Sequence, residues 1–381
     1  MFTERTSVGL DVHALSVRAA GLDTATGQLV QETLTPSPDH VRDWLRRLPQ
    51  PVAAIYEAGP TGFGLYRALD AAGIRCEVAA PSKLLRPSGD RVKTDKRDAI
   101  HLARLLHLDE YTPVAVPSIG QETARDLVRA REQARGDLMR ARHRVGKLLL
   151  RYGIIYSGGK AWTGQHLSWL SRRATRALLP AEPTRLAYDA AVDAVLTTQA
   201  RRDRLDEAIA AMAADSEYTA VVRRLSCLRG VGDLTGLGLA VEIGEWDRFT
   251  GHTIGSFVGL VPSEDSSGQN RRQGSVTKAG NKHVRRLLVE AAWHHRRPYR
   301  PSVELRRRWD RATPAARSRG EQANRRLHRR WASFDARSKR AVVANTAIAR
   351  ELAGWCWSLA VMDDYPPQNP FAAGGSKASV E

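Results

Sequence analysis

The sequence predicts an N-terminal α/β domain, then a long helical region and a helical C-terminal region. Short apolar runs that are typical of strands alternate with helical patterns up to Ala99. Beyond Pro113 and Pro117, apolar residues recur at spacings of three and four, which is the period of an amphipathic helix. From Leu225 onward, glycine-containing turns separate further helical segments. The fold class is therefore α/β followed by all-α.

The first domain is expected to open with a hairpin, because the apolar run Val8-Gly9-Leu10 ends at Asp11 and a second extended segment runs from Val17 to Gly21. The later elements are strands at 28–33, 52–57 and 76–80 and helices that start at Pro38, Gly64 and Asp95. The order βββαβαβα is that of a ribonuclease-H-like domain, in which helices cover a sheet.

Two long helices are expected next, with a Gly- and Ser-rich loop at 153–164 between them. The apolar positions that define them are Leu127, Ala134, Leu138, Ala141, Val145 and Leu148, then Val192, Val195, Leu196, Leu205, Ile209 and Met212. They predict an antiparallel helical hairpin that is free to pair with a second copy of the chain. The same pattern fits an intramolecular bundle equally well.

The segment Leu228-Arg229-Gly230-Val231-Gly232 precedes another apolar helix. Glycines two apart between helices are typical of a helix-hairpin-helix motif, in which the backbone N–H groups around Gly230 and Gly232 bind phosphate without reading bases. A tight turn between helices with no ligand explains the pattern as well. Both interpretations stay open on sequence alone.

The charge balance points to a polyanionic partner. The chain has 381 residues, with 59 Lys and Arg against 41 Asp and Glu, which gives a formal net charge of +18. Between Arg296 and Arg340 there are 16 basic residues and 4 acidic ones. Nucleic acid is the expected partner, although a solvated basic face explains any single residue. The three scattered cysteines, the N-terminal residues and the lack of long apolar runs predict a cytoplasmic, nucleoid-associated protein without a membrane partner.

Four carboxylates are candidates for metal binding. Asp11 and Glu57 end predicted strands, whereas Asp95 and Asp98 lie three residues apart in the first turn of a predicted helix. The two helical aspartates taken alone fit an N-cap and its neighbour better than a metal site. Four carboxylates at one edge of a sheet would repel unless divalent cations neutralise them, and oxygen ligands suit Mg²⁺ or Mn²⁺.

The second candidate site is the segment 259–268, which contains Ser266 and Ser267. A serine of this kind is a poor nucleophile unless a base, a metal or strong positive charge lies nearby, and Ser-Ser-Gly is common in turns. Cationic residues that could hold phosphate follow it: Arg271, Arg272, Lys278, Lys282, Arg285 and Arg286.

These motifs, in this order, resemble the DEDD transposases of bacterial insertion sequences, specifically insertion-sequence family one-hundred-ten, the RNA-guided bridge recombinases. The resemblance covers nearly the whole chain except its tail. It rests on Gly9-Leu10-Asp11, Tyr56-Glu57-Ala58-Gly59, Lys93-Thr94-Asp95-Lys96-Arg97-Asp98-Ala99, and the segments 228–232, 257–262, 266–268 and 277–281. Context differences such as Val12-His13 after the first aspartate are not expected to affect the chemistry.

The resemblance implies a Mg²⁺-binding, resolvase-like domain with Asp11, Glu57, Asp95 and Asp98 as ligands, a dimerising coiled coil, and a transposase domain with a nucleophilic serine. Motif position assigns that serine to Ser267, with Ser266 as the alternate. The family also implies element-end and target DNA duplexes, a structured guide RNA, and a homodimer or tetramer in which serine and carboxylates come from different protomers.

The expected regions are therefore a DEDD catalytic domain at 1–115, a dimerisation region at 116–220, a transposase domain at 221–362 and a disordered tail at 363–381. Two other functions stay open: a metal-dependent ribonuclease-H-like nuclease or junction resolvase without a covalent intermediate, and a non-catalytic nucleic-acid-binding scaffold. The carboxylate cluster speaks against the scaffold, because a polyanion binder gains nothing from clustered acids.

Overall fold

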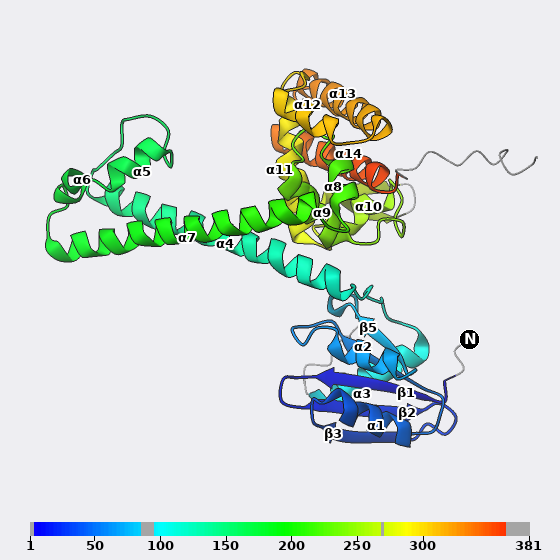
Figure 1. Ribbon diagram of the computed structural model, residues 1–381. Coiled ribbons are helices and arrows are strands. Elements are labelled where there is room, and N and C mark those ends of the chain that lie inside the picture. The colour runs from blue at the N-terminus through cyan, green and yellow to red at the C-terminus, as the bar shows by residue number, and fades with distance from the viewer. Residues whose placement is uncertain (1–3, 85–94, 268–269, 363–381) are drawn as a thin grey trace, which may run out of the picture. The chain divides into compact units, whose positions relative to one another are not determined.

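The computed structural model describes residues 4–84, 95–267 and 270–362. It divides the chain into two compact units, Met1–Ser118 and Ile119–Glu381, which are treated separately below (Figure 1). Lys93, Thr94, Gly268 and the tail at 363–381, on which several expectations rest, lie outside the described residues.

The first unit contains a five-stranded sheet with the strand order β3-β2-β1-β4-β5. Its strands are β1 (Thr6–Val12), β2 (Val17–Asp23), β3 (Leu29–Leu34), β4 (Val52–Glu57) and β5 (Arg75–Ala79). The strand β1 is antiparallel to β2 and parallel to β4, and β4 is parallel to β5. The predicted order of strands and helices in this domain is confirmed, including the opening hairpin.

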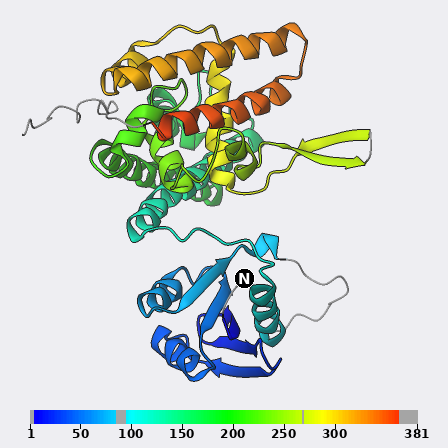
Figure 2. The same ribbon diagram turned by 90° about the vertical axis from the view of Figure 1, so that its right-hand side faces the viewer.

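Helices cover both faces of this sheet, and Figure 2 shows them on its two sides. They are α1 (Pro38–Arg47), α2 (Gly64–Ala71) and α3 (Asp95–Leu108), with the short 3₁₀ turn η1 (Pro81–Lys83) before α3. In β4, Ala54 and Tyr56 pack in the core with α1 and α2, while Ala53 and Ile55 pack with α3. This alternation follows from the two-residue period of a strand, which sends successive side chains to opposite faces.

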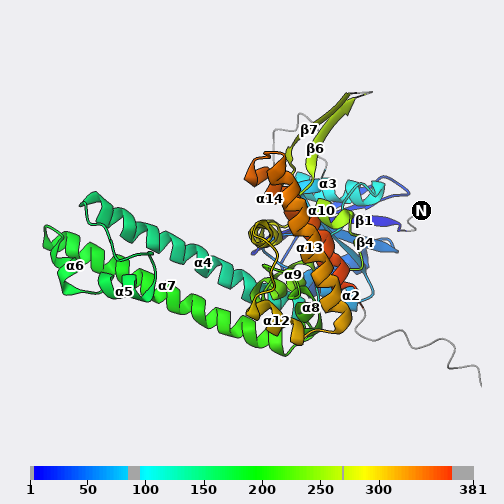
Figure 3. The same ribbon diagram turned by 90° about the horizontal axis from the view of Figure 1, so that it is seen from above.

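The second unit begins with the helical hairpin of α4 (Ile119–Arg151) and α7 (Glu182–Ala214), which lie side by side in Figures 1 and 3. The short helices α5 (Gly164–Leu170) and α6 (Arg173–Ala177) lie between them in sequence. Ala134, Leu138, Ala141 and Val145 are buried as expected, and so is Val195. Leu196 was expected on the buried face but is 44% exposed, because burial of Val195 turns the next position of the helix outward by about 100°.

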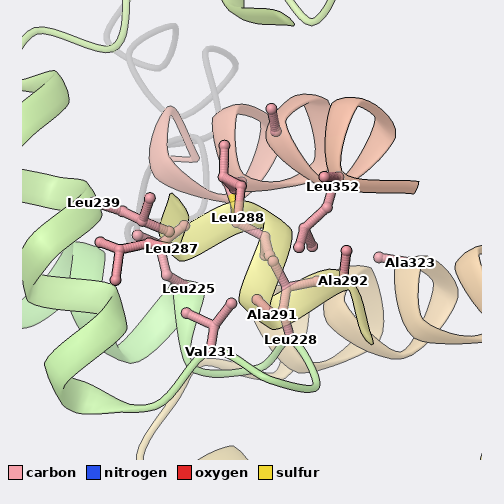
Figure 4. Close-up of a cluster of buried hydrophobic side chains, with 14 of the residues drawn as sticks. Leu225, Leu228, Val231, Leu239, Leu287, Leu288, Ala291, Ala292, Ala323 and Leu352 are labelled. Atoms are coloured by element: carbon pink, nitrogen blue, oxygen red, sulfur yellow. The ribbon is translucent and has the colours of Figure 1, made fainter. Parts of the chain in front are cut away.

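The rest of the second unit is a helical body with one projecting hairpin. The elements are α8 (Thr219–Leu225), α9 (Asp233–Ile243), α10 (Thr253–Phe257), β6 (Pro262–Ser267), β7 (Asn270–Val276), α11 (Lys282–Ala292), η2 (Trp293–Arg296), α12 (Val303–Asp310), α13 (Pro314–Ala336) and α14 (Ala341–Ala360). Figure 4 shows Leu287, Leu288 and Ala291 of α11 in the middle of the core, between Leu239 of α9 and Leu352 of α14.

The β6–β7 hairpin places Ser266 and Ser267 on a strand, whereas the sequence alone favoured a turn there. Figure 2 shows it projecting from the helices of the second unit. The sequence Pro-Ser-Glu-Asp-Ser-Ser lacks the apolar alternation by which strands are recognised. Because β6 is largely exposed, pairing of its backbone with β7 holds it in place, and a core face is not required.

None of the described helices is both long and apolar enough to cross a membrane.

Candidate catalytic and metal-binding site

Strand geometry places two of the predicted carboxylates side by side. Leu10 of β1 is opposite Tyr56 of β4 in the parallel register, so Asp11 and Glu57 follow at the carboxyl ends of neighbouring strands. Glu57 has the same parity as Ile55, whose side chain packs on the α3 face. The sheet therefore presents Glu57 toward the face from which Asp95 and Asp98 of α3 approach.

A glycine brings α3 close to β1. A Cβ atom at Gly9 would collide with the backbone oxygen of Ala99 and would lie 2.5 Å from the backbone nitrogen of Ala103. No other residue fits at Gly9, because the atoms in the way belong to the backbone of the helix. The Gly9-Leu10-Asp11 motif thus sets both the distance of α3 from the sheet and the first carboxylate of the site.

The structure places Asp11 and Asp95 together and adds His13 to them. The Nε2 atom of His13 lies 3.1 Å from Oδ2 of Asp11 and 3.8 Å from Oδ2 of Asp95. Ligand atoms of the three residues all lie within 4.8 Å of one another. Asp11 is partly buried, and the side chains of His13 and Asp95 are about half exposed, so the cluster is open to a ligand.

Negative charge accumulates at this position. Burial raises the pKa of Asp11, and His13 opposes the increase through its charge and hydrogen bond. The charges of Asp95 and Asp98 raise the pKa of Asp11 further, which shows that Asp98 belongs to the same electrostatic neighbourhood. A bound cation would relieve this repulsion.

The residues present fit a divalent cation. Two ligands on opposite sides of a Mg²⁺ ion are about 4.2 Å apart at bond lengths of about 2.1 Å, which is close to the spacing within the cluster. Glu57 and Asp98 are outside the set of three described ligand atoms, although both lie on elements that border it. On sequence alone, Val12-His13 was expected to have no effect on the chemistry, whereas the structure places His13 in the cluster. A histidine two residues after a strand-end aspartate is a signal that could have identified it.

The predicted nucleophile, Ser267, is the last residue of β6 and is exposed. Its strand pairs with β7 in a register that sets Ser267 opposite Asn270 and Asp265 opposite Arg272. Among the described residues, no hydrogen bond involves the Ser267 hydroxyl. A serine hydroxyl is a poor nucleophile unless a base, a metal or strong positive charge lies nearby.

The glycines of the predicted helix-hairpin-helix lie between α8 and α9. Gly230 has a φ of 84°, and a Cβ atom there would lie 2.6 Å from the carbonyl oxygen of Ala291 in α11. Gly232 is the N-cap residue of α9. A cavity of about 500 Å³ lies beside them, with Arg229, Arg300 and Arg308 among its lining residues. Gly230 thus has a packing role, independent of any phosphate.

The side chains of the predicted phosphate-binding cations differ in their exposure and in their contacts within the protein. Arg285 donates to the carbonyl oxygens of Val258 and Ala279, at 3.0 and 2.8 Å. Arg286 forms ion pairs with Glu132 of α4 and Glu290. Lys278, Lys282 and Arg272 are exposed. Arg285 and Arg286 therefore stabilise the fold of this unit through contacts within it. The side chain of Arg271 lies outside the described residues.

A buried glutamate organises the segment that carries Lys278 and Lys282. Glu242 of α9 is 1% exposed and accepts hydrogen bonds from Nε and Nη2 of Arg129 in α4, both at 2.8 Å. Asn281 Nδ2 donates to it at 2.7 Å, and the Asn281 side chain in turn caps the N-terminus of α11. His283 Nδ1 lies 3.2 Å from the same carboxylate. One carboxylate thus ties together α4, α9 and the start of α11.

Comparison with known proteins decides the family. A model described as the transposase IS116/IS110/IS902 family matches residues 222–305, and a DEDD transposase model of the IS110 type matches residues 8–154. The putative transposase y4qE of Sinorhizobium fredii is 39% identical over 306 residues, which cover 80% of this chain and 74% of that protein. The chain belongs to the IS110 family of transposases.

A second relative matches this IS110 transposase over almost the whole length of the relative. The transposase for insertion sequence element IS1533 of Leptospira borgpetersenii is 30% identical over 345 residues, which cover 87% of this chain and 97% of that protein. A probable family 20 transposase of Pseudomonas aeruginosa is 27% identical over 308 residues, 79% of this chain and 87% of its own. The predicted enzyme class is confirmed: this IS110 transposase cuts and rejoins DNA.

Each of the two family matches contains some of the predicted site residues. The first match contains Asp11, Glu57, Asp95 and Asp98, and the DEDD family suggests use of a divalent metal there. The second contains Gly230, Gly232 and Ser267.

Proposed function

We propose that this transposase cuts and rejoins DNA through Ser267, with Mg²⁺ held by Asp11, Glu57, Asp95 and Asp98, and that a structured RNA guides it to its DNA. The observation that carries the metal assignment is the convergence of Asp11, His13 and Asp95, with a raised pKa at Asp11. The exposed position of Ser267 at the end of β6 supports its role as nucleophile, because it can reach a phosphate without rearrangement of a core.

The proposed chemistry is transfer of a DNA phosphate to Ser267 and back. The Ser267 oxygen bonds to phosphorus while the bond to one DNA oxygen breaks, and that oxygen takes up a proton. The phosphoserine link is a phosphoester like the DNA bond that it replaces, so the second transfer needs no outside source of energy. A DNA hydroxyl of the new partner strand can therefore attack the phosphorus, rejoin the DNA and release the serine. Bound Mg²⁺ would stabilise negative charge on the phosphate oxygens. Asp11, Glu57, Asp95 and Asp98 would hold the ion, and His13 would orient Asp11 through their hydrogen bond.

Further parts of the proposal rest on family resemblance. The first unit is proposed to have a ribonuclease-H-like fold, which its strand order supports. We propose the functional regions 1–115, 116–220 and 221–362, with 363–381 as a tail. The α4–α7 hairpin is proposed to mediate a dimer or tetramer in which serine and carboxylates come from different protomers. Guide RNA and double-stranded DNA are the proposed partners, contacted in part through Lys278, Lys282, Arg272 and the loop at Gly230 and Gly232.

The test is to trap the covalent intermediate. Purified transposase with its guide RNA and a nicked DNA substrate should yield a protein–DNA adduct that survives denaturation, and mass spectrometry should place the DNA on Ser267. Ser267→Ala should abolish the adduct and strand exchange while RNA and DNA affinity stay within about twofold. Asp95→Asn and removal of divalent ions with EDTA should each lower adduct formation by at least about 100-fold.

Ser266→Ala is the matched control, because it changes the neighbouring residue in the same hairpin. It should leave adduct formation intact. An adduct on Ser266, or strand exchange by Ser267→Ala, would overturn the serine assignment. DNA cleavage without any adduct would favour metal-dependent hydrolysis. Full activity in EDTA would contradict the proposed metal site.

A further inference from the structure

A groove of the second unit lies at the base of the β6–β7 hairpin. Its volume is about 1120 Å³. Its walls come from the near end of the hairpin, from α13 and from α14, and Figure 3 shows the hairpin leaving the helical body beside α14. None of the motifs discussed above explains this groove.

Arginines dominate the polar lining of the groove. They are Arg319, Arg326, Arg330 and Arg350, against the single lining carboxylate of Glu351, which leaves a net charge of +3. Arg326 Nε and Arg330 Nη1 lie 2.7 and 3.0 Å from the two oxygens of Glu351. This carboxylate holds two guanidinium groups at the wall, and they stay about half exposed.

The other two arginines are placed differently. Arg350 is exposed, and no hydrogen bond or ion pair of its side chain occurs among the described residues. Arg319 donates to the Ser358 hydroxyl at 2.9 Å, and its guanidinium lies 4.6 Å from the centre of the Trp355 ring. The groove therefore offers both a free cation and fixed cations to an anionic ligand.

Apolar surface lies beside these charges. Val342 and Val343, at the start of α14, are 66% and 57% exposed, and Trp355 and Trp357 line the same groove. Cations next to exposed apolar and aromatic side chains form the combination by which proteins bind unpaired nucleic-acid strands, since phosphates meet the arginines and base faces meet the apolar wall.

We propose that this groove binds a single DNA strand during recombination. The inference rests on the proposed strand-transfer function, which requires strands to separate and exchange. The volume is close to that of pockets that hold drug-sized ligands, so it admits a short stretch of one strand. The groove adjoins the near end of the hairpin, at Pro262, and Ser267 is the last residue of the same strand.

The experiment compares two double variants that lose the same charge. Arg330→Gln/Arg350→Gln changes the groove, whereas Arg329→Gln/Arg340→Gln changes exposed arginines of the same region that do not line it. Fluorescence anisotropy gives the affinity for a short labelled DNA strand, the same RNA strand and the DNA duplex between 50 and 200 mM salt. Loss of two phosphate contacts should reduce the magnitude of the slope of log K against log salt by about 1.4 for the DNA strand. The loss of affinity between 50 and 200 mM salt should then be about sevenfold smaller than in the wild type.

The control variant should keep the wild-type slope for the DNA strand, and both variants should bind the duplex alike. Equal slopes for groove variant and wild type would overturn the proposal, and so would equal losses in the two variants. A larger effect on the RNA strand than on the DNA strand would overturn the assignment to DNA. The serine chemistry is tested separately, because Ser267→Ala should bind the DNA strand as the wild type does.

A measurement on the wild-type protein removes dependence on variant folding. A DNA strand that carries photoreactive bases should crosslink to the tryptic peptide 341–350, which contains Val342 and Val343. Excess unlabelled DNA strand should compete for the crosslink, and duplex should not. Crosslinking only to other peptides would contradict the groove assignment.

Discussion

At the scale of single residues, Gly9 shows how a residue without a side chain shapes the candidate metal-binding site. It contributes no ligand, yet it determines how close α3 comes to β1, and α3 carries Asp95 and Asp98. The sequence motif Gly9-Leu10-Asp11 was recognised for its aspartate. Its glycine has an equally direct role, because the backbone of α3 occupies the space that a side chain would need.

Gly9→Ala is expected to push α3 away from the sheet. The added methyl group meets helix backbone, so the cost should be about 3 kcal/mol in the free energy of unfolding, at the upper end of the range for overpacked cores. Divalent-ion-dependent strand exchange should fall together with stability, and both can be followed by denaturant unfolding and by a recombination assay.

Gly64→Ala is the matched control for this change. Gly64 begins α2 in the same unit, and a Cβ atom there would meet nothing within 4 Å. This variant should be as stable as the wild type or slightly more stable, because alanine favours a helix. Equal stability of Gly9→Ala and Gly64→Ala would contradict the assigned role of Gly9.

At the scale of elements, the carboxylate of Glu242 connects helices that are far apart in sequence. Burial alone would raise the pKa of Glu242, but hydrogen bonds from Arg129 and His283, the charge of Arg129 and the Asn281 amide lower it well below its usual range. The ionised form is therefore the one that the fold requires. Loss of this charge should loosen α4 and the N-terminus of α11 together.

The sign of the pH effect follows from the lowered pKa. Glu242 contributes stability that is fully present above its unfolded pKa of about 4.3 and is lost as the pH falls below that value. Below that pH the unfolded chain binds a proton at Glu242 that the folded chain does not bind, and this favours unfolding. Glu242→Gln should cost about 3 kcal/mol at pH 7, since it leaves Arg129 and His283 without a carboxylate. Denaturant unfolding from pH 7 to pH 3 should show a smaller acid-induced loss of stability in the variant than in the wild type.

Glu290→Gln serves as the control for that experiment. Glu290 is 57% exposed and pairs with Arg286 at the surface, where an ion pair contributes about 0–1 kcal/mol. An equal loss of stability in the two variants, or an unchanged pH dependence in Glu242→Gln, would show that the buried network does not determine stability in this unit.

At the scale of the whole molecule, charge dominates the expected binding. The chain carries a formal net charge of +18, and several of its arginines are used internally, as Arg285 and Arg286 show. The remaining exposed cations should neutralise several DNA phosphates at once. Affinity for nonspecific duplex DNA should therefore fall by about 10³ between 50 and 200 mM salt, as for proteins with six or more phosphate contacts. A loss of less than about tenfold in a filter-binding titration would show that nonelectrostatic contacts dominate.

Sequence alone determined the strands and helices of the first unit and the two long helices of the second, because the two-residue and 3.6-residue periods of apolar side chains are local properties of the chain. It also indicated the family and predicted four carboxylates as metal ligands, since strand ends and helix starts can be recognised from neighbouring residues. The tertiary structure decided what no local pattern contains: the approach of α3 over Gly9, the entry of His13 into the carboxylate cluster and the network around Glu242. It also showed that exposed residues around Ser267 form a hairpin, because strand pairing there depends on backbone hydrogen bonds that leave no trace in hydrophobic periodicity.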